Sequence, residues 1–226
     1  VDRAEVLQSE RAAAIAERRV DLADEAAVSA ALRGAGVVVL ATPVSSILAL
    51  LPAAVAAGAV VTDCGSTKRA IARNAAAQAR GARFVPGHPM AGAPVGGLAN
   101  ARSDLFAGRR WILCPERSDE DAVGVVERLA RDVGAQVVRM SAVEHDRAVA
   151  MTSHVPQILA SALAVLGARR SALAGAGPAF LDATERAGGS EAMWRDVFAT
   201  NADEVAAALW DLTQEIELVA AGLGRP

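Results

Sequence analysis

The stretch VVVLATPVSSILALLPAAVAAGAVVT, residues 37–62, decides the fold. It carries no charge and is long enough to cross a bilayer, but Pro43, Pro52 and Gly58 interrupt it. Its two ends are short β-branched runs typical of buried strands, and its alanine- and leucine-rich middle is typical of a helix. The stretch therefore predicts a strand, a crossover helix and a second parallel strand, and not a transmembrane span.

Strands and helices alternate in this way over the first 140 residues. By the same criteria we expect further strands at 82–85, 110–114 and 135–140, and helices at 4–18, 25–33, 67–80 and 119–133. Ser118 is expected to cap the last of these helices, and Gly134 to end it. Such alternation predicts a parallel, doubly wound α/β sheet.

The pattern changes at Ser141. Ser141 and Glu144 have the spacing of a capping box, which marks the start of a helix. Beyond it the sequence is helical to about Gly222, and Pro156 should kink or break the first of these helices. We therefore place a domain boundary near residue 141, between an α/β domain and an all-α domain.

Composition narrows the range of partners. The 226 residues suffice for one large domain or two small ones. The net charge is −3, so basic side chains do not outnumber acidic ones. We therefore do not expect nucleic acid to be the main partner. No signal peptide is recognisable. Because the stretch 37–62 is interpreted as a crossover, we also predict no membrane association.

Sheets of this kind bind ligands at the carboxyl ends of their strands. Three loops follow such ends, at 41–44, 63–68 and 86–92. The last contains His88, and histidine can exchange a proton near neutral pH. Two prolines and two glycines should hold it in a fixed turn. From the residues alone, a catalytic histidine and a histidine that only caps a strand end are equally good interpretations.

Ser66 and Cys64 belong to the second of these loops. Ser66 is either the N-cap of the next helix or a hydroxyl beside a ligand bound at that helix end. Cys64 is interpreted as structural, because nothing nearby would clearly lower its pKa. Cys64 and Cys114 are fifty positions apart and form no metal or redox motif. We therefore predict no metal site and a reducing, cytoplasmic compartment.

Several motifs together carry a family resemblance. Three of them are Ala41-Thr42-Pro43-Val44, Asp63-Cys64-Gly65-Ser66-Thr67-Lys68 and Gly87-His88-Pro89-Met90-Ala91-Gly92. They occur in the order and at about the spacing of the prephenate and arogenate dehydrogenases, which the chain resembles over nearly its whole length. Further agreement comes from Asp104-Leu105-Phe106 with Trp111, Glu144-His145-Asp146, Ser153-His154-Val155-Pro156 and Met193-Trp194-Arg195-Asp196.

The resemblance implies an architecture and an activity. Residues 1–140 would form a Rossmann-like dinucleotide-binding domain, and residues 141–226 a helical domain for substrate binding and homodimerisation. Enzymes of this family pass a hydride from the hydroxyl-bearing ring carbon of prephenate or arogenate to NAD, or less often NADP. The small-molecule substrate loses carbon dioxide and becomes aromatic, as a step in tyrosine biosynthesis.

The resemblance also implies roles for individual residues of the first domain. His88 matches the histidine that hydrogen-bonds the ring hydroxyl and assists the loss of its proton. Ser66 matches a serine that positions this histidine, the hydroxyl and the nicotinamide. Thr42 and Pro43 match residues that line the cofactor site.

In the helical domain the resemblance assigns Ser153, His154 and Gln157 to the substrate pocket. Gln157 stands where the family usually has a second histidine. A satisfied helix histidine remains the alternative for His154. The third histidine, His145, is interpreted as a helix-surface or structural group.

The substrate carboxylates need a cationic partner, and arginine suits them best. The family places an arginine one position after a threonine, but here Glu185 occupies that place and Arg186 follows. One residue is about 100° of helical rotation. Arg186 would therefore bind the substrate only if the helix shifts or ends there, and a solvated surface charge is the alternative.

The amino-terminal end departs from the family. A domain of this type should begin with a strand and a Gly-x-Gly-x-x-Gly turn that holds the pyrophosphate, and this sequence contains none. Val1-Asp2-Arg3 looks like the end of the second strand, where Asp2 would bind the adenosine ribose and favour NAD over NADP. Either about thirty residues precede this point by the usual size of such a unit, or the chain is short. These 226 residues alone are expected to bind NAD poorly.

Two other functions stay open. Residues 93–97 resemble the substrate loop of hydroxyisobutyrate-type dehydrogenases, another β-hydroxyacid group. Those enzymes rely on a lysine in the helical domain, whereas Lys68 is the only lysine here. The second alternative is a non-catalytic binding or regulatory derivative of the family, which the missing glycine turn supports.

Overall fold

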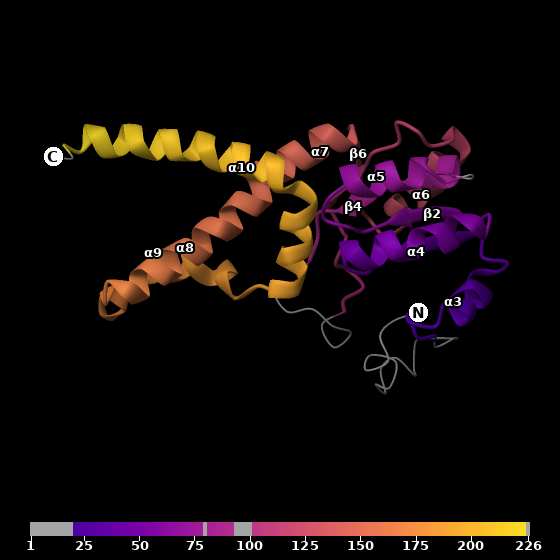
Figure 1. Ribbon diagram of the computed structural model, residues 1–226, viewed down its shortest axis with the longest axis horizontal. Helices are drawn as coiled ribbons and strands as arrows, with labels where there is room; N and C mark the ends of the chain where they lie inside the picture. Colours follow the sequence, from indigo (N-terminus) through magenta and orange to yellow (C-terminus); the bar gives the residue numbers. More distant parts are fainter. Residues whose placement is uncertain (1–19, 79–80, 93–100, 225–226) are drawn as a thin grey trace. The chain divides into compact units, whose positions relative to one another are not determined.

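A computed structural model describes residues 20–78, 81–92 and 101–224. The chain divides into two compact units, Val1–His145 and Asp146–Pro226, which are described separately (Figure 1). The expected helix at 4–18, Asp2 and the loop at 93–97 lie outside the described residues.

The stretch at 37–62 forms the predicted crossover. Strand β1 (Val37–Leu40) leads through helix α4 (Val44–Ala56) to strand β2 (Val60–Asp63), and the two strands pair in parallel. Strand β3 (Phe84–Val85) adds to β2, also in parallel. Helix α3 (Glu25–Leu32) comes before β1, and helix α5 (Arg69–Ala76) lies between β2 and β3. The strands of the first unit form two three-stranded sheets, ordered β1-β2-β3 and β4-β5-β6, and the sequence pattern was sufficient to predict the first of them.

The remaining strands of the first unit are β4 (Gly87–Pro89), β5 (Arg110–Leu113) and β6 (Gln136–Arg139). Strands β5 and β6 are parallel and joined by helix α6 (Glu120–Asp132), as predicted. Strand β4 runs antiparallel to β5, which places His88 opposite Ile112. Pro86, which has no N–H for a ladder, separates β3 from β4. His88 therefore lies on a short strand and not in a turn.

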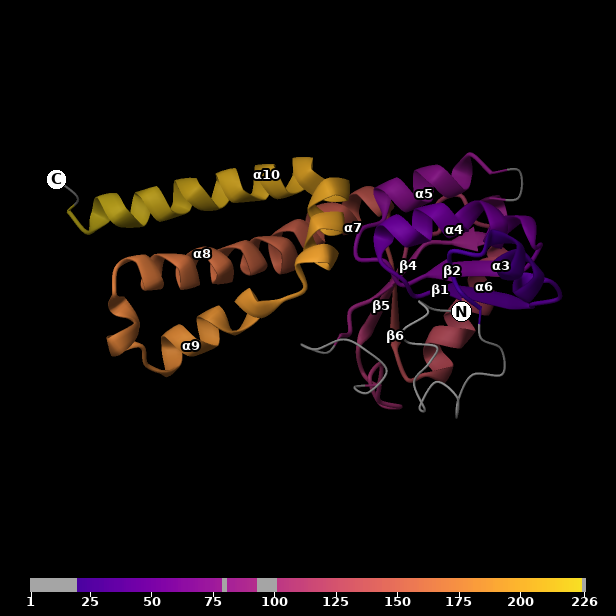
Figure 2. The same cartoon turned by 60° about the horizontal axis from the view of Figure 1, so that its bottom comes forward.

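Helices lie on both sides of the strands of the first unit, as the doubly wound class requires (Figure 2). One core cluster joins α4 and α5 to β1 and β2, with Leu51 and Ile71 fully buried. A second cluster joins α6 to β2, β3 and β5, with Val126 and Leu113 fully buried. The α/β fold class is confirmed.

Helix ends follow local signals where no distant partner competes. Gly134 follows α6 with φ of 80°, and Ser141 and Glu144 form the predicted reciprocal capping box, at 2.8 and 3.1 Å. Ser118 is not the N-cap of α6, however, because Asp119 takes that position. The Ser118 hydroxyl instead donates to the carbonyl of Phe84 at 2.7 Å and fixes β3.

The second unit is helical, as predicted. Its elements are α7 (Ala142–Val149), which begins in the first unit, the π-helix η3 (Ala150–His154), α8 (Val155–Arg169), the 3₁₀ turn η4 (Ala172–Gly175), α9 (Pro178–Thr184), the 3₁₀ turn η5 (Glu185–Gly188) and α10 (Glu191–Gly222). Pro156 is the second residue of α8 and follows η3 almost directly, so its missing N–H falls at the junction of the π and α segments. The expected irregularity therefore takes the form of a π turn just before the proline.

Within the described part of the chain, the helical run Ala142–Arg169 alone has the length and hydropathy to cross a membrane. This rests on length and composition only, and the core helix of a soluble protein meets the same criteria. The run carries buried polar side chains, among them His154 and Gln157. The absence of membrane association stays a prediction.

Candidate active site

Three neighbouring strands bring the predicted residues of the first unit to one edge of the sheet. Thr42 follows β1, Ser66 follows β2, and His88 follows β3 after the break at Pro86. Because β1, β2 and β3 are parallel neighbours, their carboxyl ends lie side by side. The expected grouping at this edge therefore follows from the strand order.

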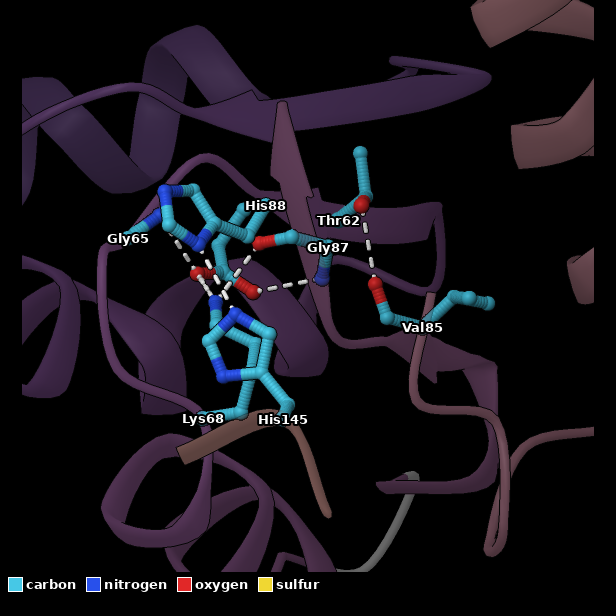
Figure 3. Close-up of polar contacts among 8 residues, drawn as sticks. Thr62, Gly65, Lys68, Val85, Gly87, His88 and His145 are labelled. Carbon is cyan, nitrogen blue, oxygen red and sulfur yellow. Dashed lines mark hydrogen bonds and ion pairs between the residues drawn. The ribbon is translucent and has the colours of Figure 1, made fainter. Parts of the chain in front are cut away.

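His88 forms a hydrogen-bonded pair with His145 (Figure 3). Nδ1 of His88 lies 2.8 Å from Nε2 of His145, and the rings meet edge to face at 5.0 Å and 64°. His145 is fully buried, whereas His88 is half-buried. The interpretation of His145 as a helix-surface group is wrong, because its ring is enclosed and faces His88.

The pair restricts how protons are placed on the two rings. In such a contact one ring nitrogen must donate and the other accept. If Nδ1 of His88 carries the proton, its Nε2 keeps a lone pair and can accept a proton from a ligand. His145 is then the orienting partner of a general base, the arrangement that activates many catalytic groups. The capping box at Ser141 placed His145 one turn into a helix, but no local signal indicated which strand it would meet.

A buried ion pair lies beneath the strand of His88. Lys68 and Asp63 form it, and both side chains are fully buried. Nζ of Lys68 also donates to the carbonyl oxygen of Gly87 at 2.6 Å. Oδ1 of Asp63 accepts from the N–H of Gly87 at 3.0 Å, and its Oδ2 accepts from the N–H of Gly65 at 2.8 Å. The residue next to His88 is therefore held at both of its backbone polar groups.

The two glycines make this close approach feasible. A Cβ atom on Gly87 would lie 2.8 Å from the carbonyl oxygen of Asp63, and one on Gly65 would lie 2.8 Å from Oδ2 of Asp63. Any larger residue would therefore push the polar groups apart. Our sequence reasoning missed the roles of Lys68 and Asp63. The available signal was a single lysine in an arginine-rich chain, five positions after an acid that ends an apolar strand.

The loop at 63–68 contains Ser66 and Cys64, each of which had been interpreted from the sequence. Ser66 is not an N-cap, because Lys68 occupies that position of α5, and Ser66 is half-buried ahead of it. Burial first, and then the negative charge of Asp63, raise the pKa of the Cys64 thiol to about 12. This supports the structural interpretation of Cys64, because a thiol with a raised pKa is a poor nucleophile.

Thr42 differs from its neighbours. Its hydroxyl oxygen is buried and has no hydrogen-bond partner within the described part of the chain. It lies between the end of β1 and Pro43, which precedes the first turn of α4. That turn contains no acidic residue, so the positive end of the helix is uncompensated by its own side chains. An unsatisfied hydroxyl beside a helix N-terminus is a suitable partner for a polar ligand.

His154 lies in the second unit, on the π-helix η3, and is buried. Its Nδ1 is 3.4 Å from Nδ2 of Asn201, which donates to the carbonyl oxygen of Asp146 at 2.8 Å. Trp194 and Phe198 meet the His154 ring edge to face, at 5.9 and 6.5 Å. Asn201 has non-helical φ and ψ of −139° and 28°, which kinks α10 at this point.

Ser153 and Gln157 accompany His154 on the same helical run. Ser153 is half-buried and Gln157 is buried. Ser153 and His154 lie in η3, and Gln157 lies in the first turn of α8. The three residues are close together because these two turns are consecutive. Asn201 was missed by sequence reasoning, since a buried asparagine inside an α-helical pattern gives no local sign of its partner.

Arg186 does not continue helix α9. The helix ends at Thr184, and Glu185 begins the 3₁₀ turn η5, so the rotation expected for an uninterrupted helix does not apply. Both Glu185 and Arg186 are exposed. The exposed side chain of Arg186 also fits the alternative of a solvated surface charge, so its role in substrate binding stays a prediction.

No group of three or more histidine, cysteine, aspartate or glutamate residues that could hold a metal occurs among the residues that the structure describes. The fold and the site define the class as a dinucleotide-binding α/β protein with an added helical domain.

The particular family follows from two matches. The model of the prephenate dehydrogenase nucleotide-binding domain matches residues 6–139, and that of the prephenate dehydrogenase dimerization domain matches residues 141–223. The chain belongs to the prephenate dehydrogenase family.

Individual relatives agree with this assignment. The chain is similar to the prephenate dehydrogenase of Bacillus subtilis, with 33% identity over 88% of this chain and 61% of the relative. For the cyclohexadienyl dehydrogenase of Zymomonas mobilis the identity is 28%, over 76% of this chain and 62% of the relative. The chain thus spans about three fifths of the length of these curated relatives.

Two solved structures share the fold. Prephenate dehydrogenase from Aquifex aeolicus, in complex with hydroxyphenyl propionate and NAD+, has a TM-score of 0.74 and 27% identity, covering 91% of this chain and 74% of that one. Synechocystis arogenate dehydrogenase has a TM-score of 0.74 and 27% identity, covering 86% and 73%.

Proposed function

We propose that this protein oxidatively decarboxylates prephenate or arogenate, with hydride transfer to NAD, in tyrosine biosynthesis. The observation that carries the proposal is the His88–His145 pair at the carboxyl ends of the strands, in a chain that both family models match. NAD, when bound, supplies the hydride acceptor.

His88 is the proton acceptor in this proposal. With the Nδ1 proton directed to His145, Nε2 of His88 accepts the proton of the ring hydroxyl. The hydroxyl carbon becomes a carbonyl carbon as its hydrogen departs with two electrons. The bond to the ring carboxylate then breaks and carbon dioxide leaves. The electron pair of that bond makes the ring aromatic, and the former carbonyl oxygen takes back the proton from His88 to give the phenol. Ser66 would orient the hydroxyl toward His88.

The residues near β1 fit a dinucleotide. Thr42 offers an unsatisfied buried hydroxyl, and the start of α4 offers backbone N–H groups without a competing acid. Thr42 and Pro43 would therefore line the cofactor, as the resemblance implies. The preference for NAD over NADP depends on Asp2, which lies outside the described residues.

The helical unit would bind the substrate. His154, Ser153 and Gln157 provide polar groups from one helical run, in which His154 is fixed by its neighbours. Arg186 is our candidate for a substrate carboxylate, because guanidinium binds carboxylate in bidentate fashion.

The same unit would form a homodimer. Apolar side chains remain exposed on α8 and α10, among them Leu166, Trp210 and Leu218 at 51%, 66% and 67%. Large apolar patches on a protein surface usually mark an interaction site. The second family match describes a dimerization domain, so we infer that a second copy of the chain covers them. Light scattering at micromolar concentration should give twice the chain mass.

A four-way assay tests the function. The chain, and a form extended at its amino terminus by a strand and glycine-rich turn, are mixed with prephenate or arogenate and with NAD or NADP. Reduced nicotinamide is followed by its absorbance. We expect the extended form to turn over with NAD and one of the two substrates, and the chain alone to do so poorly because it should bind NAD weakly. Absence of turnover in both forms, with NAD bound, would instead support a non-catalytic derivative.

A further inference from the structure

We propose that Lys68 is a positioning residue for His88, and that it acts through the carbonyl group of Gly87. The proposal deepens the function proposed above and rests on it. Lys68 does not touch the reacting atoms in this view. It holds the strand on which His88 is carried.

The first reason is the burial of the ion pair. Lys68 and Asp63 are both 0% exposed, and a buried charge is unfavourable unless it is paired and hydrogen-bonded. Replacing such a pair with apolar residues of similar volume is often neutral or even stabilising. A contribution to folding stability therefore does not explain why Lys68 and Asp63, and not two apolar residues, occupy these positions. An apolar pair, however, could not donate to the carbonyl oxygen of Gly87.

The second reason is that the two sides of β4 are held differently. On one side the strand pairs with β5, where the carbonyl oxygen of Pro86 accepts from the N–H of Cys114 at 2.9 Å and the N–H of Met90 donates to the carbonyl oxygen of Arg110 at 2.8 Å. Pro86 and Pro89 have no N–H, so only Gly87 and His88 can donate from the backbone between them. The N–H of Gly87 is directed to Asp63, and its carbonyl oxygen accepts from Lys68. The ion pair thus holds the side of β4 that is not bonded to β5.

The third reason is the precision that the histidine pair requires. Nδ1 of His88 and Nε2 of His145 are 2.8 Å apart, and a hydrogen bond weakens steeply when its donor moves or tilts. His88 is bonded directly to Gly87, so a shift of Gly87 displaces the ring. A misplacement of about 1 Å can lower a rate by about 10²-fold.

Lys68→Met removes the ammonium group and keeps most of the side-chain volume. Thr62→Val is the matched control, because the buried Thr62 hydroxyl donates to the carbonyl oxygen of Val85 at 2.8 Å, two residues before Gly87. Both variants delete a buried side-chain donor to the same backbone segment. Only Lys68→Met releases Gly87.

Turnover, melting temperature and the nitrogen–nitrogen coupling across the His88–His145 hydrogen bond are measured in both variants. We expect both melting temperatures to fall. Only Lys68→Met should lose the coupling, with kcat lowered by roughly 10 to 10²-fold. Coupling and kcat within twofold of Thr62→Val would overturn the proposal and leave Lys68 a purely structural residue.

Lys68→Met leaves Asp63 unpaired and could prevent folding. In that case the double variant Asp63→Asn/Lys68→Met removes both charges. The nitrogen–nitrogen coupling and kcat of this double variant then test the proposal. Recovered folding with a lost coupling supports the proposal, whereas recovered folding with an intact coupling overturns it. If neither the chain nor its extended form has dehydrogenase activity with NAD bound, the proposed function fails, but the coupling still tests the role of Lys68.

Discussion

His88 is half-buried and His154 is buried, and the two histidines have different neighbours. His88 faces a second ionisable ring and lies on a strand anchored by a buried ion pair. His154 faces the amide of Asn201 at 3.4 Å and the edges of two aromatic rings. A second imidazole can take up or release a proton, whereas an amide cannot. The first environment suits proton transfer, and the second suits a fixed binding group.

Replacing the two histidines should give the largest contrast. In the form extended by the glycine-rich unit, His88→Asn is expected to lower kcat by roughly 10²–10⁴, the range for a positioned acid–base group, with little change in NAD affinity. His154→Asn should act mainly on KM for the substrate. Steady-state kinetics and NAD titration measure both. Turnover of His88→Asn within a few-fold of the parent would assign proton transfer to another residue.

Replacing the partners of the two histidines sharpens the comparison. His145→Asn should lower kcat by about 10 to 10²-fold, because His88 loses its orienting partner. Asn201→Ala removes the donor to the Asp146 carbonyl and should destabilise the protein by about 1–3 kcal/mol. Denaturant unfolding and kinetics are compared for the two variants. Equal losses of kcat in both would show that the environments do not differ in function.

Arg186 tests whether the second unit binds the carboxylate. Arg186→Ala should raise KM by roughly tenfold or more, since a hydrogen bond to a charged group contributes about 1.5–3 kcal/mol. Glu185→Ala is the neighbouring control and should have a smaller effect. If Glu185→Arg instead creates or greatly improves activity on prephenate, Arg186 is the wrong residue.

Cys64 should give the smallest effect. Its pKa is raised to about 12, so at pH 8 only about one thiol in 10⁴ is ionised. In a Cys114→Ala background, labelling by a thiol reagent at pH 8 should be about 10³-fold slower than for an ordinary cysteine, and faster as pH rises. Cys64→Ser should leave turnover nearly unchanged. Fast labelling at pH 8 would contradict the structural interpretation.

Local patterns predicted what depends on neighbours in the sequence. The crossover at 37–62 followed from apolar runs and helix-breaking residues, and the capping box at Ser141 followed from one spacing. Ser118 shows the limit, because a local rule made it a cap while a distant carbonyl took its hydroxyl. The fold class could therefore be predicted from the sequence, whereas individual helix caps could be predicted only in part.

The polar pairs of the site, His88–His145 and Lys68–Asp63, could not be predicted from local sequence patterns. His88 and His145 are separated by 57 positions, and hydrophobic periodicity carries no information about which buried polar groups meet. Lysine is almost never fully buried without a partner, so nothing local placed Lys68 in the interior. The family resemblance supplied candidate residues, but it did not supply the contacts that orient them.

The ring nitrogens of His88 show most directly whether this histidine can act as the base. Nitrogen-15 spectra of the chain with labelled histidine, with His145→Asn for assignment, distinguish a protonated from an unprotonated nitrogen. We expect Nδ1 of His88 to carry the proton toward His145 and Nε2 to be unprotonated when the ring is neutral. A neutral ring with its proton on Nε2 and a bare Nδ1 would contradict the role of His88 as proton acceptor.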